Sequence, residues 1–387
     1  MVAKDMGFFV VLFTQRKSQL ENPEFSAADQ IYYAENLLDE TKVLKELRLM
    51  QQSQKEICAI LSFIDPFVSY AARLSDILGL KTMSVKALAI MENKIKIRNQ
   101  LKELSSSPFY AVFDPEIPQE PLIEKYQRFL PLILKPPASN GSKDVSLVNT
   151  RQELEEVLVS LRRKYPGTPI LAEEYLDGPQ YLIEVLVKNG EIYPIGVIEQ
   201  ELAEEEAFIV VGYKYPAGLE DLPYRKLLEA VEAIIKQLGL KEGSCHLEMR
   251  YVHGEWKLIE INPRMSGGAM NIIIQSGTGI NLIREIINLH ADQPLQLIKT
   301  QKSHVYARYL TIDAYGKLLA VIGEDTAREI DGVVYVYVKP LEGRILTSPY
   351  SMGNRYACII AAADSPDEAK EIAITAAKEI KFYIEAF

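Results

Sequence analysis

The chain has 387 residues, of which 48% are hydrophobic and 25% are charged, a composition typical of a soluble globular protein with two to three domains. Its formal net charge of −10 argues against nucleic acid as the main partner, because a phosphate backbone requires a basic surface. No apolar run approaches the roughly 20 residues of a membrane span, the N-terminus lacks the pattern of a signal peptide, and three dispersed cysteines without a CxxC pair are typical of buried or inert thiols, so we expect a cytoplasmic protein.

Strands and helices alternate in the N-terminal part of the chain. Apolar runs predict strands over 7–14 and 57–63, with an amphipathic helix over 40–54 between them. A second helix over 66–80 is expected to end at Gly79. This alternation predicts a small parallel sheet.

The pattern changes after this part. Residues 83–104 are mostly helical in pattern and lead into a segment with three prolines between 115 and 121, which we interpret as a linker. A strand over 130–136, a loop of small residues over 137–144 and a strand over 145–148 follow. The remaining predicted elements are a helix from Thr150 to Tyr165, strands over 169–176 and 180–200 with a turn at Asn189-Gly190, a helix over 224–240, strands over 304–312 and 332–338, and a helix over 365–382.

Residues 244–264 are predicted to form a hairpin of two strands. A two-residue loop, His253-Gly254, would place Glu248 opposite Ile259 and bury a carboxylate on the apolar face. A three-residue loop separates polar from apolar side chains, so we predict that loop. Its cross-strand pairs are Glu248 with Glu260, His246 with Asn262, Leu247 with Ile261 and Met249 with Ile259.

Two carboxylates directly opposite each other are destabilising unless a positive charge lies between them. A divalent cation such as Mg²⁺, which takes carboxylate oxygens and substrate phosphates, would supply that charge at Glu248 and Glu260. Arg264 adds a fork suited to phosphate or carboxylate, and Gly267-Gly268 lets backbone N–H groups approach an anion. The alternative is an exposed face on which these acids form a solvated salt bridge with Arg250.

Two lysines and a pair of acids add to this hairpin. Lys135 lies within an apolar strand, where it requires an anionic partner, and the loop that follows it is small enough to fold over phosphates. Taken alone, Glu173-Glu174 would be a solvated strand end and Lys94 an exposed helix lysine. It is their order along the chain, together with the hairpin, that favours a functional role for these residues.

This order, with "LILKP", "EEYLDGP", "HLEM" and "IEINPRMSGG", closely resembles the ATP-grasp superfamily over nearly all of residues 57–387. The resemblance implies an α/β protein with an α+β ATP-grasp fold. It implies a shortened Rossmann-like N-terminal domain over 1–82, an ATP-grasp domain over 83–302 with a lid at about 130–195, and a C-terminal α+β subdomain over 303–387. It also implies that the chain lacks the usual first strand and most of the first helix. The sheet edge left exposed would then be covered in a homodimer.

The resemblance assigns site residues by position. Lys94 and Lys135 would contact the ATP phosphates, with Ser142 in the loop above them. Glu173 would meet the adenine amino group, the backbones of Glu174 and Leu176 would hold the ring edge, and Gln180 stands where the family usually has a ribose-binding Glu. The metal ligands for Mg²⁺, or alternatively Mn²⁺, would be Glu248, Glu260 and Asn262. Arg264 and Lys135 would be catalytic, and His246, Arg264, Gly267 and Gly268 would border the substrate site.

Within the superfamily, "GYKYPAGL", "INPRMSGG" and "IIAAADSPDEAKEIA" look like the amino-acid ligases, which join a carboxylate to an amine through an acyl phosphate. Two small molecules, with amino acids as the expected pair, would then be the substrates. His246 could equally be a packed histidine bonded to backbone. A non-catalytic nucleotide-binding homologue and a ligase similar to phosphoribosylglycinamide synthetase remain as alternatives, whereas the "RH" of biotin carboxylase is absent.

Overall fold

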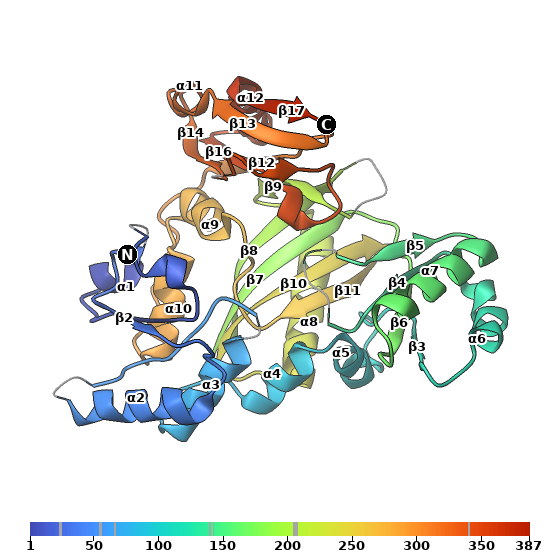
Figure 1. Ribbon diagram of the computed structural model, residues 1–387, viewed down its shortest axis with the longest axis horizontal. Helices are drawn as coiled ribbons and strands as arrows, with labels where there is room; N and C mark the ends of the chain where they lie inside the picture. Colours follow the sequence, from blue (N-terminus) through green and yellow to red (C-terminus); the bar gives the residue numbers. More distant parts are fainter. Residues whose placement is uncertain are drawn as a thin grey trace.

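The computed structural model describes residues 1–22, 25–53, 56–65, 67–138, 141, 143–203, 208–339 and 341–387. A large central sheet is flanked by an N-terminal part, a small four-stranded sheet with its helices, and a C-terminal part (Figure 1). In these described ranges no helix is long and apolar enough to cross a membrane.

The central sheet has eight strands in the order β11-β10-β7-β8-β9-β12-β16-β14, and all neighbouring pairs are antiparallel. The predicted turn at Asn189-Gly190 joins β7 to β8, with φ of 53° and 80° as a type I′ turn requires. The strands are β7 (Gln180–Lys188), β8 (Glu191–Leu202), β9 (Val210–Tyr215), β10 (Gly243–Val252), β11 (Glu255–Asn262), β12 (His304–Leu310), β14 (Val333–Val338) and β16 (Ala357–Ala363).

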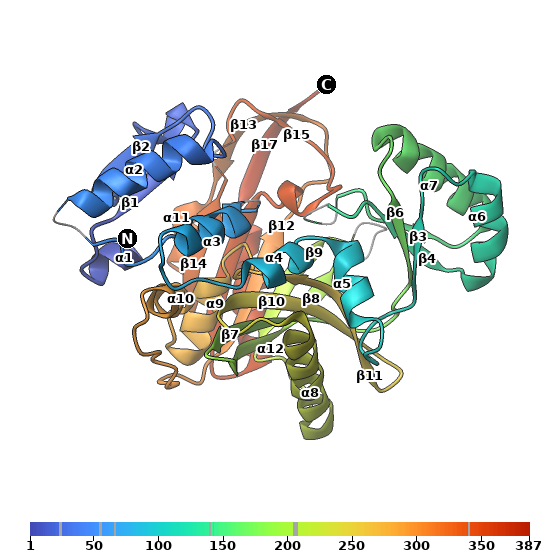
Figure 2. The same cartoon turned by 90° about the horizontal axis from the view of Figure 1, so that it is seen from below.

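The two faces of the central sheet carry different side chains and pack against different helices. Because side chains alternate along a strand, Cys245, Leu247 and Met249 of β10 point to one face, where they pack against α4 (Val85–Met91), α5 (Lys94–Leu101) and α8 (Asp221–Leu238). Figure 2 shows α8 on this side of β10. His246 and Glu248 point to the opposite face, whose apolar part packs against α9 (Met270–Thr278) and α10 (Leu282–His290).

A four-stranded antiparallel sheet, in the order β3-β6-β4-β5, lies beside the central sheet with α6 and α7 on it. It starts at Tyr110 and ends at Glu174, so it begins before the predicted lid range of about 130–195, and residues from Gln180 onward belong to the central sheet. The linker prediction is wrong, because the proline-rich segment holds the start of a helix. The elements are β3 (Tyr110–Phe113), α6 (Gln119–Tyr126), β4 (Leu132–Lys135), β5 (Ser146–Val148), α7 (Arg151–Lys164) and β6 (Ile170–Glu174).

The N-terminal part contains a two-stranded parallel sheet, but its second strand is not the predicted one. β1 (Val11–Thr14) pairs with β2 (Gln30–Tyr33). Residues 57–63 form no strand; the side chains of Ile57 and Ile60 instead pack into an apolar cluster with α2 (Glu40–Gln52) and α3 (Phe67–Ile77). Burial of an apolar run does not by itself require a strand. A short helix, α1 (Val2–Asp5), precedes β1.

The C-terminal part completes the central sheet and adds a small sheet of its own. Its strands β12, β14 and β16 carry the helix α12 (Pro366–Glu379) on one face. β12, β14 and α12 agree with the predicted elements, but the strand β16 was not predicted, and the predicted helix over 365–382 ends at Glu379 because Lys381 begins a further strand. A three-stranded sheet, in the order β15-β13-β17, packs beside them. The strands of this small sheet are β13 (Gly316–Ile322), β15 (Ile345–Leu346) and β17 (Lys381–Ala386), and the helix α11 (Glu324–Arg328) follows β13.

Candidate active site

The hairpin of β10 and β11 places Glu248 opposite Glu260 and His246 opposite Asn262, as predicted. The loop is nevertheless the two-residue turn His253-Gly254, since Val252 pairs directly with Glu255. A β-bulge between Glu248 and Met249 shifts the register by one residue, so that Met249 pairs with Leu258 rather than with Ile259. The predicted three-residue loop is therefore wrong, although the facing acids are correct.

The facing acids and Asn262 form a set of oxygen donors. The Asn262 side-chain NH₂ donates to Glu260 Oε1 at 3.1 Å, and Lys94 Nζ lies 3.5 Å from the same oxygen. Burial and the charge of Glu260 raise the pKa of Glu248 to about 7. Burial acts in the same direction on Glu260, but Lys94 and Lys135 outweigh it and hold its pKa below the ordinary value.

These donors fit a hard divalent cation. Among the described residues no group of three or more His, Cys, Asp or Glu side chains could hold a metal ion by itself, so a cation here would take two carboxylates and an amide oxygen from the protein. Mg²⁺ is commonly bound in this way, with substrate phosphates and water as its other ligands. A cation would also offset the repulsion from Glu260, which adds to burial in raising the pKa of Glu248.

A buried ion cluster lies next to this set. Lys135 Nζ lies 2.5 Å from Glu173 Oε2, and Arg98 Nε donates to Glu173 Oε1 at 2.5 Å. Burial raises the pKa of Glu173, but the two cations outweigh it and lower that pKa to about 2. Both oxygens of Glu173 are thus engaged, and its role at an adenine amino group stays a prediction. Arg98, which the sequence reasoning missed, lies one helical turn after Lys94.

The predicted nucleotide contacts Leu176 and Gln180 are held by Arg250. The Leu176 carbonyl accepts a hydrogen bond from the Arg250 guanidinium, and Arg250 Nε donates to Gln180 Oε1 at 3.1 Å. The Gln180 amide donates to Gln200 Oε1 at 2.9 Å. The side chain of Glu174 accepts from the backbone N–H of Phe109. Ser142 lies outside the described residues.

A tight turn at Gly178 brings the start of β7 against the end of β10 beside Gln180 and Arg250. At Gly178, which precedes β7, an added Cβ would lie 2.2 Å from the carbonyl oxygen of Tyr251, so only glycine allows this backbone approach. The backbone N–H of Tyr251 donates to the Pro179 carbonyl. The "DGP" sequence thus fixes the start of β7 against the end of β10.

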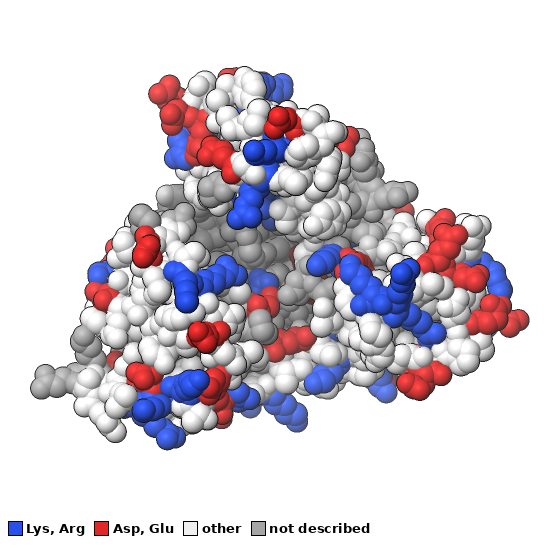
Figure 3. Space-filling model, in the orientation of Figure 1, with Lys and Arg blue, Asp and Glu red and all other residues white. Residues whose placement is uncertain are grey.

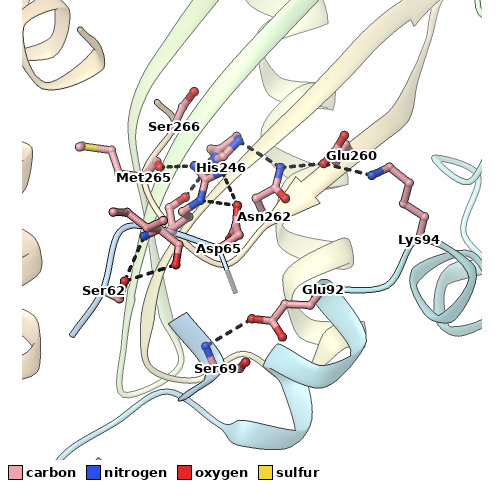
Figure 4. A network of polar contacts seen from close by, with 12 residues as sticks. Ser62, Asp65, Ser69, Glu92, Lys94, His246, Glu260, Asn262, Met265 and Ser266 are labelled. Atoms are coloured by element: carbon pink, nitrogen blue, oxygen red, sulfur yellow. Dashed lines mark hydrogen bonds and ion pairs between the residues drawn. The ribbon is translucent and has the colours of Figure 1, made fainter. Parts of the chain in front are cut away.

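His246 is held between backbone and amide. Its Nδ1 lies 2.7 Å from the Arg264 carbonyl oxygen, and Asn262 donates to its Nε2 at 3.2 Å. Burial lowers the pKa of His246 to about 4, so the ring is neutral, with the proton on Nδ1. Figure 4 shows the resulting line of contacts from His246 through Asn262 and Glu260 to Lys94.

Arg264 is paired with Asp65, a residue that the sequence reasoning missed. Its Nε and Nη2 donate to Asp65 Oδ2 at 2.9 and 2.6 Å. Asp65 lies just before α3, in the N-terminal part of the chain, and 199 positions separate it from Arg264. The side chains are 20% and 18% exposed, so the pair is largely removed from solvent.

The predicted glycine loop follows Arg264 and is anchored by a second missed acid. Glu184 of β7, opposite His246, accepts the backbone N–H of Ser266 at 2.8 Å. Burial raises the pKa of Glu184 to about 8. Gly268 has φ of +74°, and a Cβ there would lie 2.6 Å from the Tyr309 hydroxyl.

All predicted site residues within the described ranges line one cavity of about 260 Å³ between the four-stranded sheet, β10, β11 and the C-terminal part. Figure 3 shows this face of the molecule hollowed, with lysine and arginine side chains on the rim. The predicted residues on its wall are Lys94, Lys135, Glu173, Glu174, Leu176, Gln180, His246, Glu248, Glu260, Asn262, Arg264, Gly267 and Gly268. The wall also includes Arg250, Tyr213, Met352 and Arg355, which the sequence reasoning did not assign to the site.

Comparisons with known proteins agree with this geometry. The ATP-grasp domain family matches residues 128–272, and the family "L-amino acid ligase C-terminal domain 2" matches residues 308–385. An uncharacterized protein of Sinorhizobium fredii, y4rH, is 30% identical over 67% of this chain and 54% of its own. Alanine–anticapsin ligase of Bacillus amyloliquefaciens is 25% identical over 73% of this chain and 65% of its own. The chain thus spans between 54% and 65% of the length of these relatives, less than two thirds in each case.

The fold is also that of a solved enzyme. The crystal structure of L-amino acid ligase from Bacillus licheniformis matches with a TM-score of 0.83 at 20% identity, and covers 99% of this chain and 95% of its own. The chain therefore has the ATP-grasp fold and carries an ATP-grasp domain followed by an L-amino acid ligase C-terminal domain.

Proposed function

We propose that the protein is an ATP-dependent ligase that joins the carboxylate of one amino acid to the amine of another, releasing ADP and phosphate. The observation that carries this proposal is the facing pair Glu248 and Glu260 with Asn262, set in one cavity with Lys135 and Arg264. Alanine–anticapsin ligase, whose name describes such a joining reaction, supports amino acids as the substrate class.

In the reaction, an oxygen of the first carboxylate attacks the γ-phosphorus of ATP, and the bond to the bridging oxygen of ADP breaks. The amine nitrogen then attacks the acyl carbon, phosphate leaves, and a proton leaves the nitrogen. Phosphoryl transfer depends mainly on positioning and charge neutralisation. The main contribution of the protein is therefore made by the cations of the cavity, which bind the phosphates and neutralise their charge. Lys94 and Lys135 bind the phosphates, and Arg264 neutralises the charge that develops at the transferred group.

The metal is Mg²⁺, with Mn²⁺ as a substitute, held by Glu248, Glu260 and Asn262. When bound, it supplies positive charge at the phosphate oxygens. Neighbouring residues set the ionisation and the orientation of these metal ligands. Lys94 keeps Glu260 ionised, and neutral His246 accepts from the Asn262 amide, which turns the amide oxygen away from the ring. The four-stranded sheet covers the nucleotide and excludes water, which would otherwise hydrolyse the acyl phosphate.

The test is Glu260→Gln, assayed as ADP release from MgATP with a panel of the twenty proteinogenic amino acids offered singly and in pairs. We expect at least a hundredfold loss of turnover, because the neutral amide cannot balance the cation. Glu255→Gln is the matched control, since Glu255 begins the same strand and its side chain is 60% exposed. Full turnover in the Glu260 variant contradicts the metal site.

The same assay separates the alternatives. Tight ATP binding without ADP release for any amino acid would favour a non-catalytic nucleotide-binding protein. ADP release that requires an amine on a sugar phosphate would favour a ligase similar to phosphoribosylglycinamide synthetase. The hydrogen bonds of Gln180 to Gln200 and from Arg250 argue that this departure from the family pattern is accommodated in the site.

We also propose a homodimer and a cytoplasmic location. The exposed edges of the N-terminal two-stranded sheet offer hydrogen-bonding groups that a second subunit would cover. A monomeric mass in light scattering at micromolar concentration would overturn the dimer, and fractionation of cells that express the protein would test the location.

A further inference from the structure

The C-terminal part contributes to the cavity an arginine that has no role in the proposed reaction so far. Arg355 follows the helical turn Met352–Asn354 and precedes β16. It lies within the match to the L-amino acid ligase C-terminal domain and outside the match to the ATP-grasp domain. Its side chain nevertheless lines the same cavity as Glu248 and Arg264.

Arg355 differs from the other cations of the cavity wall in its partners. Lys94, Lys135 and Arg264 each pair with a carboxylate, whereas none of the described carboxylates lies within 4.0 Å of the Arg355 guanidinium. Arg250 also lacks such a carboxylate, but Leu176 and Gln180 accept its hydrogen bonds. Within the described residues, the positive charge of Arg355 therefore has no carboxylate to compensate it.

Aromatic rings hold the Arg355 guanidinium in place. Its central carbon lies 3.9 Å from the centre of the Tyr309 ring and 5.9 Å from that of Tyr213. Nη1 donates to the Val210 carbonyl at 3.3 Å and to the Tyr213 hydroxyl at 3.4 Å. Stacking on a ring fixes the plane of a guanidinium without neutralising its charge, so the group is preorganised for an anion.

The opposite edge of this guanidinium has no hydrogen bond to any described group. Nε is buried and has no partner there, and Nη2 lies 3.6 Å from the place that a Cβ on Gly268 would occupy. Nε and Nη2 form the edge that Arg264 presents to Asp65. A carboxylate at this edge of Arg355 would form the same kind of charge-assisted fork.

We propose that Arg355 binds the non-reacting carboxylate of the amino acid that supplies the amine. This inference rests on the proposed ligase function. The phosphates of ATP have Lys94 and Lys135, and the reacting carboxylate must lie at the metal ligands beside Arg264. An amino acid that enters as the nucleophile brings a further carboxylate. Among the described cations of the cavity wall, Arg355 is the arginine whose Nε–Nη2 edge has no described partner. The C-terminal domain thereby restricts the amine substrate to amino acids.

The test compares each amine-supplying amino acid with its carboxamide, in the wild type and in Arg355→Gln. The wild type should use the amino acid with a KM at least tenfold lower than the carboxamide. The variant should lose this preference through a rise of at least tenfold in the KM for the amino acid, and Arg355→Lys should recover part of it. Arg344→Gln is the control, since Arg344 is exposed in the same C-terminal part.

Hydroxylamine separates the two halves of the reaction, because it traps an acyl phosphate as a hydroxamate and carries no carboxylate. The loss caused by Arg355→Gln should be at least tenfold smaller for hydroxamate formation than for amide formation. Equal losses, together with an equal rise in the KM for ATP, would show that Arg355 serves the phosphates and would overturn the proposal.

Calorimetry distinguishes failure of this inference from failure of the ligase function. Amino acids of the panel are titrated singly into protein loaded with Mg²⁺ and a non-hydrolysable ATP analogue. Binding that weakens at least tenfold in Arg355→Gln supports the carboxylate site even if no hydroxamate forms, in which case the ligase function alone fails. If hydroxamate forms but Arg355→Gln leaves amino-acid binding unchanged, the ligase function stands and only this inference is overturned.

Discussion

Glu184 is a buried carboxyl group that no motif marks. In the sequence it is one acid within the apolar run of β7, and its importance depends on a loop 82 positions away whose Ser266 N–H it accepts. Its exposed fraction is only 1%, and burial raises its pKa to about 8. At neutral pH it is therefore mostly protonated, and it anchors the glycine loop without adding a full negative charge beside Arg264.

Glu184→Gln should change the pH dependence of stability. The carboxyl group binds its proton more tightly in the folded protein than in the unfolded chain, whose ordinary value is 4.5, so wild-type stability falls as pH rises between 4.5 and about 8. This fall approaches about 1.4 kcal/mol per pH unit for one group. Gln keeps the acceptor for Ser266 and does not titrate. In urea unfolding, the free energy of unfolding of the variant relative to that of the wild type should therefore increase between pH 5.5 and pH 8.5. Parallel profiles would contradict the assignment.

The residues that sequence could identify were those with a local motif. Lys135, Glu260 and Asn262 stand in short, recognisable runs, and each lines the cavity. Arg98 and Asp65 escaped because their partners come from distant segments: Arg98 meets Glu173, which is 75 positions away, and Asp65 meets Arg264, which is 199 away. Only the helical spacing of Arg98 from Lys94 gave any local indication.

The hairpin of β10 and β11 shows how a correct pairing can rest on a wrong loop. Segregation of polar and apolar faces required Glu248 opposite Glu260, and a longer loop was the simplest way to obtain it. The chain instead uses a two-residue turn and inserts Ile259 as a bulge, whose carbonyl accepts a hydrogen bond from Arg98 at 2.7 Å. Alternation alone cannot locate such an inserted residue, because both arrangements give the same faces at the site.

His253→Asn should stabilise this turn. His253 has φ of +50°, a conformation that is costly for most side chains, whereas the chain uses Asn189-Gly190, with φ of 53° and 80°, for the equivalent turn between β7 and β8. We expect a gain of about 0.5–1 kcal/mol in the free energy of unfolding, measured by urea titration. His253→Ala is the control, since Ala does not favour positive φ. An equal gain for Ala would point to a cause other than the turn.

The arrangement of the parts explains which predictions about the fold succeeded. Alternation and turn residues marked the antiparallel strands β4 to β8, β10 to β12 and β14, whereas β9, β13, β15, β16 and β17 were not predicted. The N-terminal part was misread, since its second strand, Gln30–Tyr33, has only four residues and the longer apolar run at 57–63 looked more like a strand. That run leads to Asp65, so the misread segment is the one that reaches the site.

Asp65→Asn tests whether the N-terminal part positions Arg264. The substitution keeps the size of the side chain but removes the charge that holds Nε and Nη2 of Arg264. A released guanidinium would lie less often at the transferred phosphoryl group, so we expect kcat for ADP release to fall roughly tenfold to a hundredfold. The affinity for ATP should change little, because Asp65 is not among the residues of the cavity wall.

A double-mutant cycle gives a second readout that does not depend on activity. Asp65→Asn, Arg264→Gln and the double variant should show a coupling of about 1 kcal/mol in the free energy of unfolding, as expected for a largely buried charged pair in contact. Asp76→Asn, an exposed position in α3, controls for general effects on the N-terminal part. Additive effects in the cycle would mean that Asp65 does not hold Arg264 in solution. A coupled pair with unchanged kcat would instead mean that the contact joins the two parts of the molecule without serving catalysis.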